Sequence, residues 1–247
     1  MLKGNFITDP ILASRQHFKY LDIIDMVWIC CLMLSTFTAS KIFDLGEFQF
    51  TAGVLIYPFT YIFSDVFTEV YGYRQTRRIV WTGLGMLLLS SVVLRGMVAV
   101  PPSQSYGDQE AFSTIFGQST LLTIATMMSF FSGEVTNSYV LAKMKIGSNG
   151  KWLWARATAS TLAGQSIDNF IFYFVAFGLN GTFPPSTIVS LWLSCVVFCT
   201  VYEFLATPLT YKICNSLKRA EGLDVYDRGT NFNPFAVFFL KRRNSET

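Results

Sequence analysis

Five acidic side chains stand inside four long apolar stretches in the middle and later parts of this sequence, where ionisable groups are costly and therefore mark candidate functional sites. They are Asp65, Glu69, Glu134, Asp168 and Glu203. A buried carboxylate can accept hydrogen bonds from the N–H groups of a flat heterocycle, attract a cationic amine, or carry a proton. We therefore expect these acids to line a binding site for a small planar, donor-rich or cationic solute.

Three of these acids have the same spacing to a following cation. Asp65, Glu134 and Glu203 each lie nine residues before a basic residue; these basic residues are Arg74, Lys143 and Lys212. At a rise of about 1.5 Å per residue, each acid would sit roughly 13 Å from the level of the cations. If the three stretches are helices that run in the same direction, the spacing predicts a ring of acids at one depth.

Amide side chains accompany two of the acids on the same helix face. Asn137 follows Glu134 by three residues, and Gln165 and Asn169 flank Asp168. Such groups can recognise a polar ligand, or they can join neighbouring helices through interhelical hydrogen bonds. We include all three amides in the predicted binding site, and the second interpretation stays open for some of them.

Glu69 has a further interpretation, because it lies nearer the predicted membrane interface. There it could reach headgroup water or pair with Arg74 or Arg77. Arg156, early in a later apolar stretch, is expected to extend its side chain to the same interface.

The apolar stretches that carry these residues predict an all-α integral membrane protein with a single domain. Of the 247 residues 51% are hydrophobic and 14% are charged, whereas soluble domains carry about 25% charged residues. Six stretches are long enough to cross about 30 Å of hydrocarbon as helices. They cover residues 21–40, 49–71, 79–98, 119–142, 152–178 and 187–213. Pro58 and Pro208 are expected to kink the second and sixth helices.

Basic residues are distributed unevenly over the segments between these stretches. Seventeen of the 19 lysines and arginines fall at the N-terminus, after the second and fourth stretches, or at the C-terminus; Lys41 and Arg95 are the exceptions. Since cytoplasmic loops are enriched in Lys and Arg, six spans would place both termini in the cytoplasm.

The sequence lacks the motifs of several enzyme classes. There is no G-x-x-x-x-G-K-[ST] loop, so we do not expect this chain to hydrolyse ATP. There is no H-E-x-x-H or G-x-S-x-G motif, and the single histidine, His17, lies outside the predicted spans. We expect no enzyme activity, metal or cofactor, although paired acids leave an aspartyl-type membrane protease open. The net charge of +3 gives no indication of nucleic-acid binding, because the cations lie at span ends.

Two runs of this sequence resemble the queuosine precursor transporters, also called the vitamin-uptake-transporter-like family. The runs are YPFTYIFSDVFTEVYGYRQTRR, residues 57–78, and KWLWARATASTLAGQSIDNFIFYFVAFG, residues 151–178. The tail GLDVYDRGTNFNPF, residues 222–235, is similar to the ending of one branch of that family.

The resemblance implies import of 7-deazaguanines such as preQ0, preQ1 or queuine across the cell inner membrane, to supply tRNA modification. It also implies kinship with the six-helix substrate-binding components of energy-coupling-factor importers, but without their ATPase module. By motif position, Asp65, Glu69, Gln165 and Asp168 match the polar residues of the family. The other candidates rest on the residues of this sequence alone.

Three alternatives remain open at this point. The chain could be a solute-binding membrane subunit that requires a partner ATPase, a proton-coupled carrier of another small planar or cationic solute, or a membrane enzyme. The expected partners are a small-molecule substrate and the lipid bilayer, with no nucleic acid. The sequence leaves open whether the chain forms a homo-oligomer and which precursor it prefers.

Overall fold

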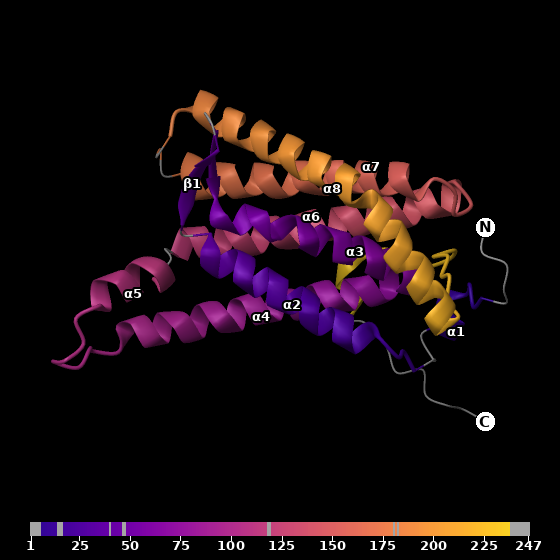
Figure 1. The fold of residues 1–247 in the computed structure, drawn as a ribbon, viewed down its shortest axis with the longest axis horizontal. Coiled ribbons are helices and arrows are strands. Elements are labelled where there is room, and N and C mark those ends of the chain that lie inside the picture. The colour runs from indigo at the N-terminus through magenta and orange to yellow at the C-terminus, as the bar shows by residue number, and fades with distance from the viewer. Residues whose placement is uncertain are drawn as a thin grey trace.

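The computed structural model describes residues 6–13, 17–39, 41–45, 48–117, 120–179, 181 and 183–237. Long helices dominate the fold and run side by side along its longest axis (Figure 1). The α-helices are α1 Pro10–Ala13, α2 Leu21–Thr38, α3 Tyr57–Tyr71, α4 Tyr73–Ala99, α5 Gln109–Phe116, α6 Thr120–Gly147, α7 Leu153–Tyr173 and α8 Pro185–Glu221. The remaining elements are strands β1 Ile42–Leu45 and β2 Phe48–Thr51, the 3-10 turns η1 Ala52–Leu55 and η3 Pro234–Val237, and the π-helical turn η2 Phe174–Gly178.

Within the described part of the chain, four stretches are long and apolar enough to cross a membrane: α2, α4, α8 and Gln109–Gly147, which contains α5 and α6. The all-α membrane architecture is therefore confirmed. The two other predicted spans contain α3 and α7. With 15 residues α3 extends only about 22 Å, and α7 carries polar residues along its length. That these two helices also span the membrane stays a prediction.

The second predicted span, residues 49–71, is wrong in its first third. β1 and β2 pair there as an antiparallel hairpin, with Ile42 opposite Thr51, and η1 follows before the helix begins. Pro58 occupies the first turn of α3. Proline has no N–H to donate and is accommodated best at a helix start. Pro58 therefore begins α3 and does not kink it, contrary to the expectation.

The helix α3 lies in the interior of the bundle, with 12 of its 15 residues buried against α2, α4, α6 and α8 (Figure 1). The Trp28 ring of α2 packs on Phe67 of α3 and Phe130 of α6, with ring centroids 6.1 and 6.0 Å apart. Its indole N–H donates to the carbonyl oxygen of Thr60 at 3.0 Å. Gly83 of α4 permits this packing, because a Cβ there would lie 2.6 Å from the Trp28 ring.

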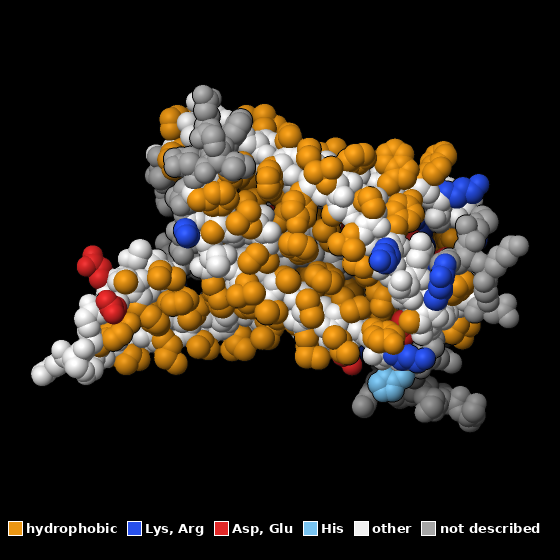
Figure 2. Space-filling view, in the orientation of Figure 1, with side chains coloured by type: hydrophobic (Ala, Val, Ile, Leu, Met, Phe, Trp, Pro, Cys, Tyr) orange, Lys and Arg blue, Asp and Glu red, His pale blue; other side chains and the backbone are white. Residues whose placement is uncertain are grey.

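Nonpolar side chains cover much of the face of the molecule that Figure 2 shows. Large exposed hydrophobic residues are frequent on α4 and α8, among them Leu88, Leu89, Val92, Val197, Val201 and Leu205. A surface of this kind marks contact with lipid. On this face, most of the visible lysine and arginine side chains lie at one end of the molecule (Figure 2).

The first and last described segments of the chain meet at that same end (Figure 1). Ile7 forms a parallel β-bridge with Leu223, the second residue after α8. The hairpin β1–β2 and α5 lie at the opposite end. The helix α8 connects the two ends, continues through Pro208, and bends along its course, as expected for an internal proline.

Candidate functional site

Asp65 of α3 and Asn137 of α6 form one completely buried pair. The Asn137 Nδ2 group donates to Asp65 Oδ1 at 2.8 Å. Because a carboxylate oxygen can only accept here, the bond fixes the orientation of the amide. The other atoms of the pair, Asp65 Oδ2 and Asn137 Oδ1, have no hydrogen-bond partner within the described part of the chain.

Glu134 of α6 and Glu203 of α8 are also buried, with at most 1% of each residue exposed. None of their four carboxylate oxygens forms a hydrogen bond with a residue that the structure describes. The Ser64 hydroxyl is a near neighbour of Glu134, but by geometry it does not bond to the carboxyl. Leaving one such buried polar group unpaired costs about 1–3 kcal/mol. Polar groups that only hold helices together usually have a hydrogen-bond partner, so these unpaired carboxyl groups require another explanation.

Asp168 of α7 is held by two tyrosines of α3. Tyr57 and Tyr61 both donate their hydroxyl groups to Asp168 Oδ2, and the Tyr61 bond is 3.0 Å long. We did not predict either tyrosine, because aromatic residues in a span usually pack or face lipid. Their spacing carried the signal: Tyr57, Tyr61 and Asp65 follow one another at intervals of four residues and share one helix face.

Gln165 and Asn169 interact with each other on α7. Asn169 Nδ2 donates to the Gln165 backbone oxygen at 2.9 Å and to Gln165 Oε1 at 2.6 Å. The Gln165 side chain is fully buried, and its Nε2 has no partner among the described residues.

These residues come from four helices and lie near one another. Glu203 and Glu134 are neighbours of Asp65, and Asp168 is a neighbour of Glu134. Thirteen buried polar side-chain atoms lack a partner in the described structure, and seven of them belong to predicted site residues. We call this group the acid cluster; its members are Asp65, Glu134, Asn137, Gln165, Asp168, Asn169 and Glu203.

The acid cluster is closely packed. A Cβ added at Gly133 would lie 2.6 Å from the Asp168 Cβ and 2.5 Å from the Tyr61 hydroxyl. A Cβ added at Gly164 would lie 2.9 Å from the Asn137 Cβ. Two glycines thus bring α3, α6 and α7 close enough for the polar groups to meet.

Glu69 occupies a different environment, one helical turn after Asp65. Its carboxylate accepts two bonds from Arg156, of 2.6 and 3.2 Å, and one from Lys218 of 2.6 Å. The Lys145 ammonium lies 3.7 Å away. The structure therefore places Glu69 in an ion cluster that joins α3, α6, α7 and α8.

Two expectations about this region are corrected by the structure. Glu69 pairs with cations from other helices rather than with Arg74 or Arg77. Arg156 does not reach outward to an interface, because it is 1% exposed and bound to Glu69. The two hydrogen bonds to the Glu69 carboxylate compensate the positive charge of the Arg156 guanidinium inside the bundle, so this side chain does not need to extend to the interface.

The segment after α8 closes over the ion cluster. Lys145 Nζ donates to the Glu69 backbone oxygen at 2.6 Å, to the Val225 backbone oxygen at 2.7 Å and to Asp224 Oδ1 at 2.8 Å. Lys218 also pairs with Asp224, at 2.8 Å. The tail residues Asp224 and Val225 thus cover the ion cluster at this end of the molecule.

The same tail is fastened to the start of α4. Asp227 Oδ2 accepts the backbone N–H of Tyr73 at 2.9 Å. Burial raises the pKa of the Asp227 carboxyl, and this hydrogen bond acts in the opposite direction. Arg77 Nη1 donates to the backbone oxygens of Asn231 and Asn233, at 2.8 and 2.7 Å.

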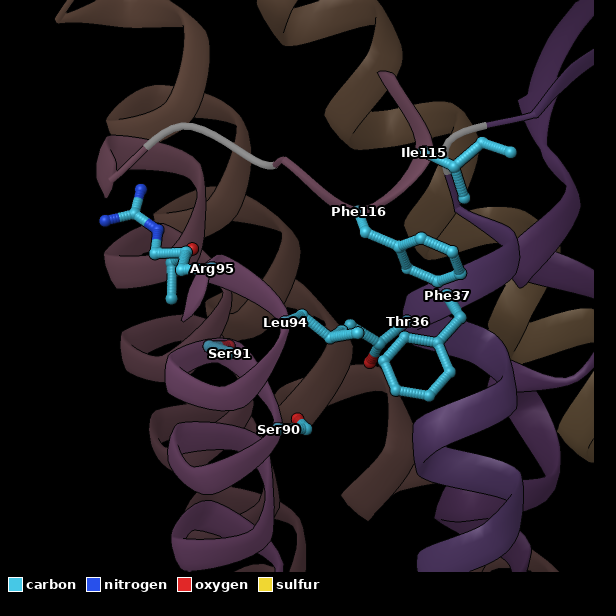
Figure 3. A pocket seen from close by; sticks show the side chains of 9 residues that line it. Thr36, Phe37, Ser90, Ser91, Leu94, Arg95, Ile115 and Phe116 are labelled. Carbon is cyan, nitrogen blue, oxygen red and sulfur yellow. The ribbon is translucent and has the colours of Figure 1, made fainter. Parts of the chain in front are cut away.

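A small cavity lies away from the acid cluster, between α2, α4, α5 and α6 (Figure 3). Its volume of about 20 Å³ has room for little more than a water molecule. Phe37, Ser90, Arg95 and Phe116 are among its lining residues. The cavity is therefore too small for a bicyclic base and shares no residue with the acid cluster.

Comparison with known proteins gives a consistent picture. The family model described as "Putative vitamin uptake transporter" matches residues 51–213. A "Probable queuosine precursor transporter" from Bacillus subtilis (strain 168) is 28% identical over 190 residues, which cover 75% of this chain and 81% of that protein. A "Queuosine precursor transporter" from Escherichia coli (strain K12) is 23% identical over 183 residues, covering 74% and 79%.

No solved structure matches the chain. The family model, in contrast, covers well over half of its length and includes α3, α4, α6, α7 and most of α8. The relatives and the apolar helices support the same assignment. This chain is therefore a multi-pass membrane protein of the vitamin uptake transporter family, the family of the queuosine precursor transporters.

Proposed function

We propose that this protein imports queuosine precursors, 7-deazaguanines such as preQ0, preQ1 or queuine, across the cell inner membrane for salvage into tRNA. The relatives named as queuosine precursor transporters support the substrate class. Family membership also favours a transporter over a membrane enzyme.

The observation that carries the proposal is the set of unpaired atoms in the acid cluster. Six are acceptors, on Asp65, Glu134, Asn137 and Glu203, and one is a donor, Gln165 Nε2. A 7-deazaguanine presents the complementary groups: ring N–H and exocyclic NH₂ donors, and one carbonyl oxygen. A bound base would therefore satisfy polar atoms that are costly when left unpaired.

In this proposal six helices span the membrane, as in the substrate-binding components of energy-coupling-factor importers, and both termini are cytoplasmic. The helices α3 and α7 carry polar side chains, and the surrounding apolar helices shield α3 from lipid. The gathering of cations at the end where the described chain ends meet supports the orientation.

Transport requires the packed acid cluster to open. Pro208 of α8 lies between Glu203, in the acid cluster, and Lys218, in the ion cluster. We propose that α8 flexes at Pro208, so that the ion cluster separates when the base leaves toward the cytoplasm. Pro208 is a suitable hinge, because proline has no backbone N–H and the helix lacks one of its hydrogen bonds there.

The test is uptake of labelled precursor into cells that cannot synthesise it. Asp168→Asn and Glu134→Gln should lose uptake while they reach the membrane at wild-type levels. Lys212→Gln, an exposed substitution on the same molecule, is the matched control and should transport normally. Full uptake by both acid-cluster variants would contradict the assigned binding site.

Liposomes that contain only the purified protein separate this proposal from the alternatives. Uptake without ATP or a second protein would exclude a subunit that depends on a partner ATPase. Stimulation by an inward proton gradient would identify proton coupling, for which the unpaired carboxylates of Glu134 and Glu203 are the candidates. Recovery of chemically unchanged precursor would exclude a membrane enzyme.

A further inference from the structure

The hydrogen bonds between Asn169 and Gln165 determine which end of the Gln165 amide is free. The Asn169 atom that contacts the Gln165 backbone oxygen must be nitrogen, because a carbonyl oxygen only accepts. The same nitrogen contacts the Gln165 side chain at 2.6 Å, so the contacted side-chain atom must be oxygen. The free end of the Gln165 amide is therefore its NH₂ group.

This NH₂ group is the single unpaired side-chain group in the described acid cluster that can only donate. The other unpaired atoms of the cluster are carboxyl or amide oxygens. The nearby hydroxyls of Thr161 and Thr200 also lack partners in the described structure, but a hydroxyl can donate or accept and so does not discriminate. Gln165 is completely buried, so its preference for an acceptor cannot be met by bulk water.

Gln165 belongs to the buried face of α7, together with Thr161, Gly164 and Asp168. This face packs closely on α6, because a Cβ added at Gly164 would lie 2.9 Å from the Asn137 Cβ and 3.0 Å from the Gly133 carbonyl oxygen. Asp168 follows one turn later on the same face of α7. A ring bound among the acids would therefore bring its edge within reach of Gln165.

We propose that Gln165 is the specificity-determining residue that reads the ring carbonyl oxygen of the bound base, and that Asn169 is the positioning residue that orients its amide. The inference rests on the proposed function, because it assumes that a 7-deazaguanine binds at the acid cluster. A base with an amino group in place of the carbonyl would bring a donor against the Gln165 donor. Both groups would then be buried without a partner.

The experiment measures equilibrium binding of two bases to the purified full-length protein. The bases are 7-deazaguanine and 2,6-diamino-7-deazapurine, which differ at the ring carbonyl position and at the adjacent N1, a donor in the first base and an acceptor in the second. A change in preference between wild type and a Gln165 variant therefore isolates the contribution of Gln165. The wild type should prefer 7-deazaguanine by about tenfold or more, because the other base leaves a buried donor without its acceptor. Gln165→Glu exchanges the donor for an acceptor and should lower the preference for 7-deazaguanine by about tenfold or more.

Asn169→Asp tests the positioning role without changing Gln165. A carboxylate at residue 169 can only accept, so it would attract the Gln165 NH₂ and turn the amide oxygen toward the base. The preference for the carbonyl base should then fall by about tenfold. Gln75→Glu, the same exchange at a half-buried site of α4, is the control and should keep the wild-type preference.

The binding results distinguish failure of the proposed function from failure of the role assigned to Gln165. A wild type that binds neither base contradicts the proposed function, and with it the inference. A wild type that binds both bases equally, or a Gln165→Glu variant that keeps the preference, overturns the inference alone. If Gln165→Glu fails to fold, Asn169→Asp decides: an unchanged preference overturns the inference, and a reduced one supports it.

Discussion

At the scale of the residue, two buried glutamates differ in how their carboxyl groups are compensated. Glu69 is compensated by Arg156, Lys218 and Lys145, whereas the carboxyl oxygens of Glu134 have no partner among the described residues. Strongly unfavourable burial of this kind persists where function requires it. The two residues should therefore respond to mutation in opposite directions.

Glu134→Met should stabilise the protein and abolish transport. The substitution removes two unpaired buried oxygens and leaves a flexible apolar side chain of similar volume, which should add about 1–3 kcal/mol to the free energy of unfolding. Thermal unfolding in detergent and precursor uptake measure the two effects. A variant that is less stable than wild type would show that Glu134 is structural.

Glu69→Gln should destabilise the protein by about 3–5 kcal/mol, because it leaves buried cations without their counter-charge. Thermal unfolding under the same conditions measures this loss. Lys212→Gln also removes one charge, but from an exposed position on α8, and should change stability by less than about 0.5 kcal/mol. Equal stabilities of the two variants would contradict the importance of the ion cluster.

Sequence reasoning identified the acids and amides because a polar group in an apolar stretch needs an explanation. It missed the partners of Glu69, since Arg156 and Lys218 lie 87 and 149 residues away. Helix packing alone decides which distant charges meet. It missed Tyr57 and Tyr61 for a different reason: their spacing places them on one face with Asp65, but the sequence does not show that their hydroxyl groups meet the carboxyl group of Asp168.

At the scale of the element, the helix positions could be predicted from apolar length, but the start of α3 could not. The stretch 49–56 is as apolar as a helix requires, and only the pairing of β1 with β2 distinguishes it. The close contact of α6 with α7 was also not predicted in detail. It depends on two glycines whose small size matters only where another backbone approaches.

Gly164→Val should weaken the packing of α7 on α6. Its Cβ would lie 3.0 Å from the Gly133 carbonyl oxygen, so backbone must move, at a cost of about 1–3 kcal/mol. Gly85→Ala is the control, since no described neighbouring side chain or helix lies within 4 Å of its added Cβ. That substitution should raise stability by about 0.5–1 kcal/mol through helix propensity. Thermal unfolding of both variants should therefore shift in opposite directions.

At the scale of the whole molecule, the tail after α8 connects the last helix to the start of α4 and to the ion cluster. The lysines of the ion cluster, Lys145 and Lys218, both bind Asp224 of the tail. The tail, the ion cluster and the bend of α8 thus lie along one path from the acid cluster to the end where the cations gather. We expect the tail to loosen when that end opens.

Arg77→Ala should release the tail, because Arg77 holds the backbone oxygens of Asn231 and Asn233. Limited proteolysis should cut the variant in the tail several times faster than the wild type. Arg78→Ala removes the neighbouring, exposed cation and should not change the cleavage rate. Equal rates for both variants would show that Arg77 does not fasten the tail.

The central claim is that the acid cluster binds the transported base, and equilibrium binding of labelled precursor to purified wild type and Glu203→Gln tests it most directly. The account predicts tight binding by wild type and a loss of at least about tenfold in the variant, with both proteins folded. Binding of equal strength by the two proteins would contradict it.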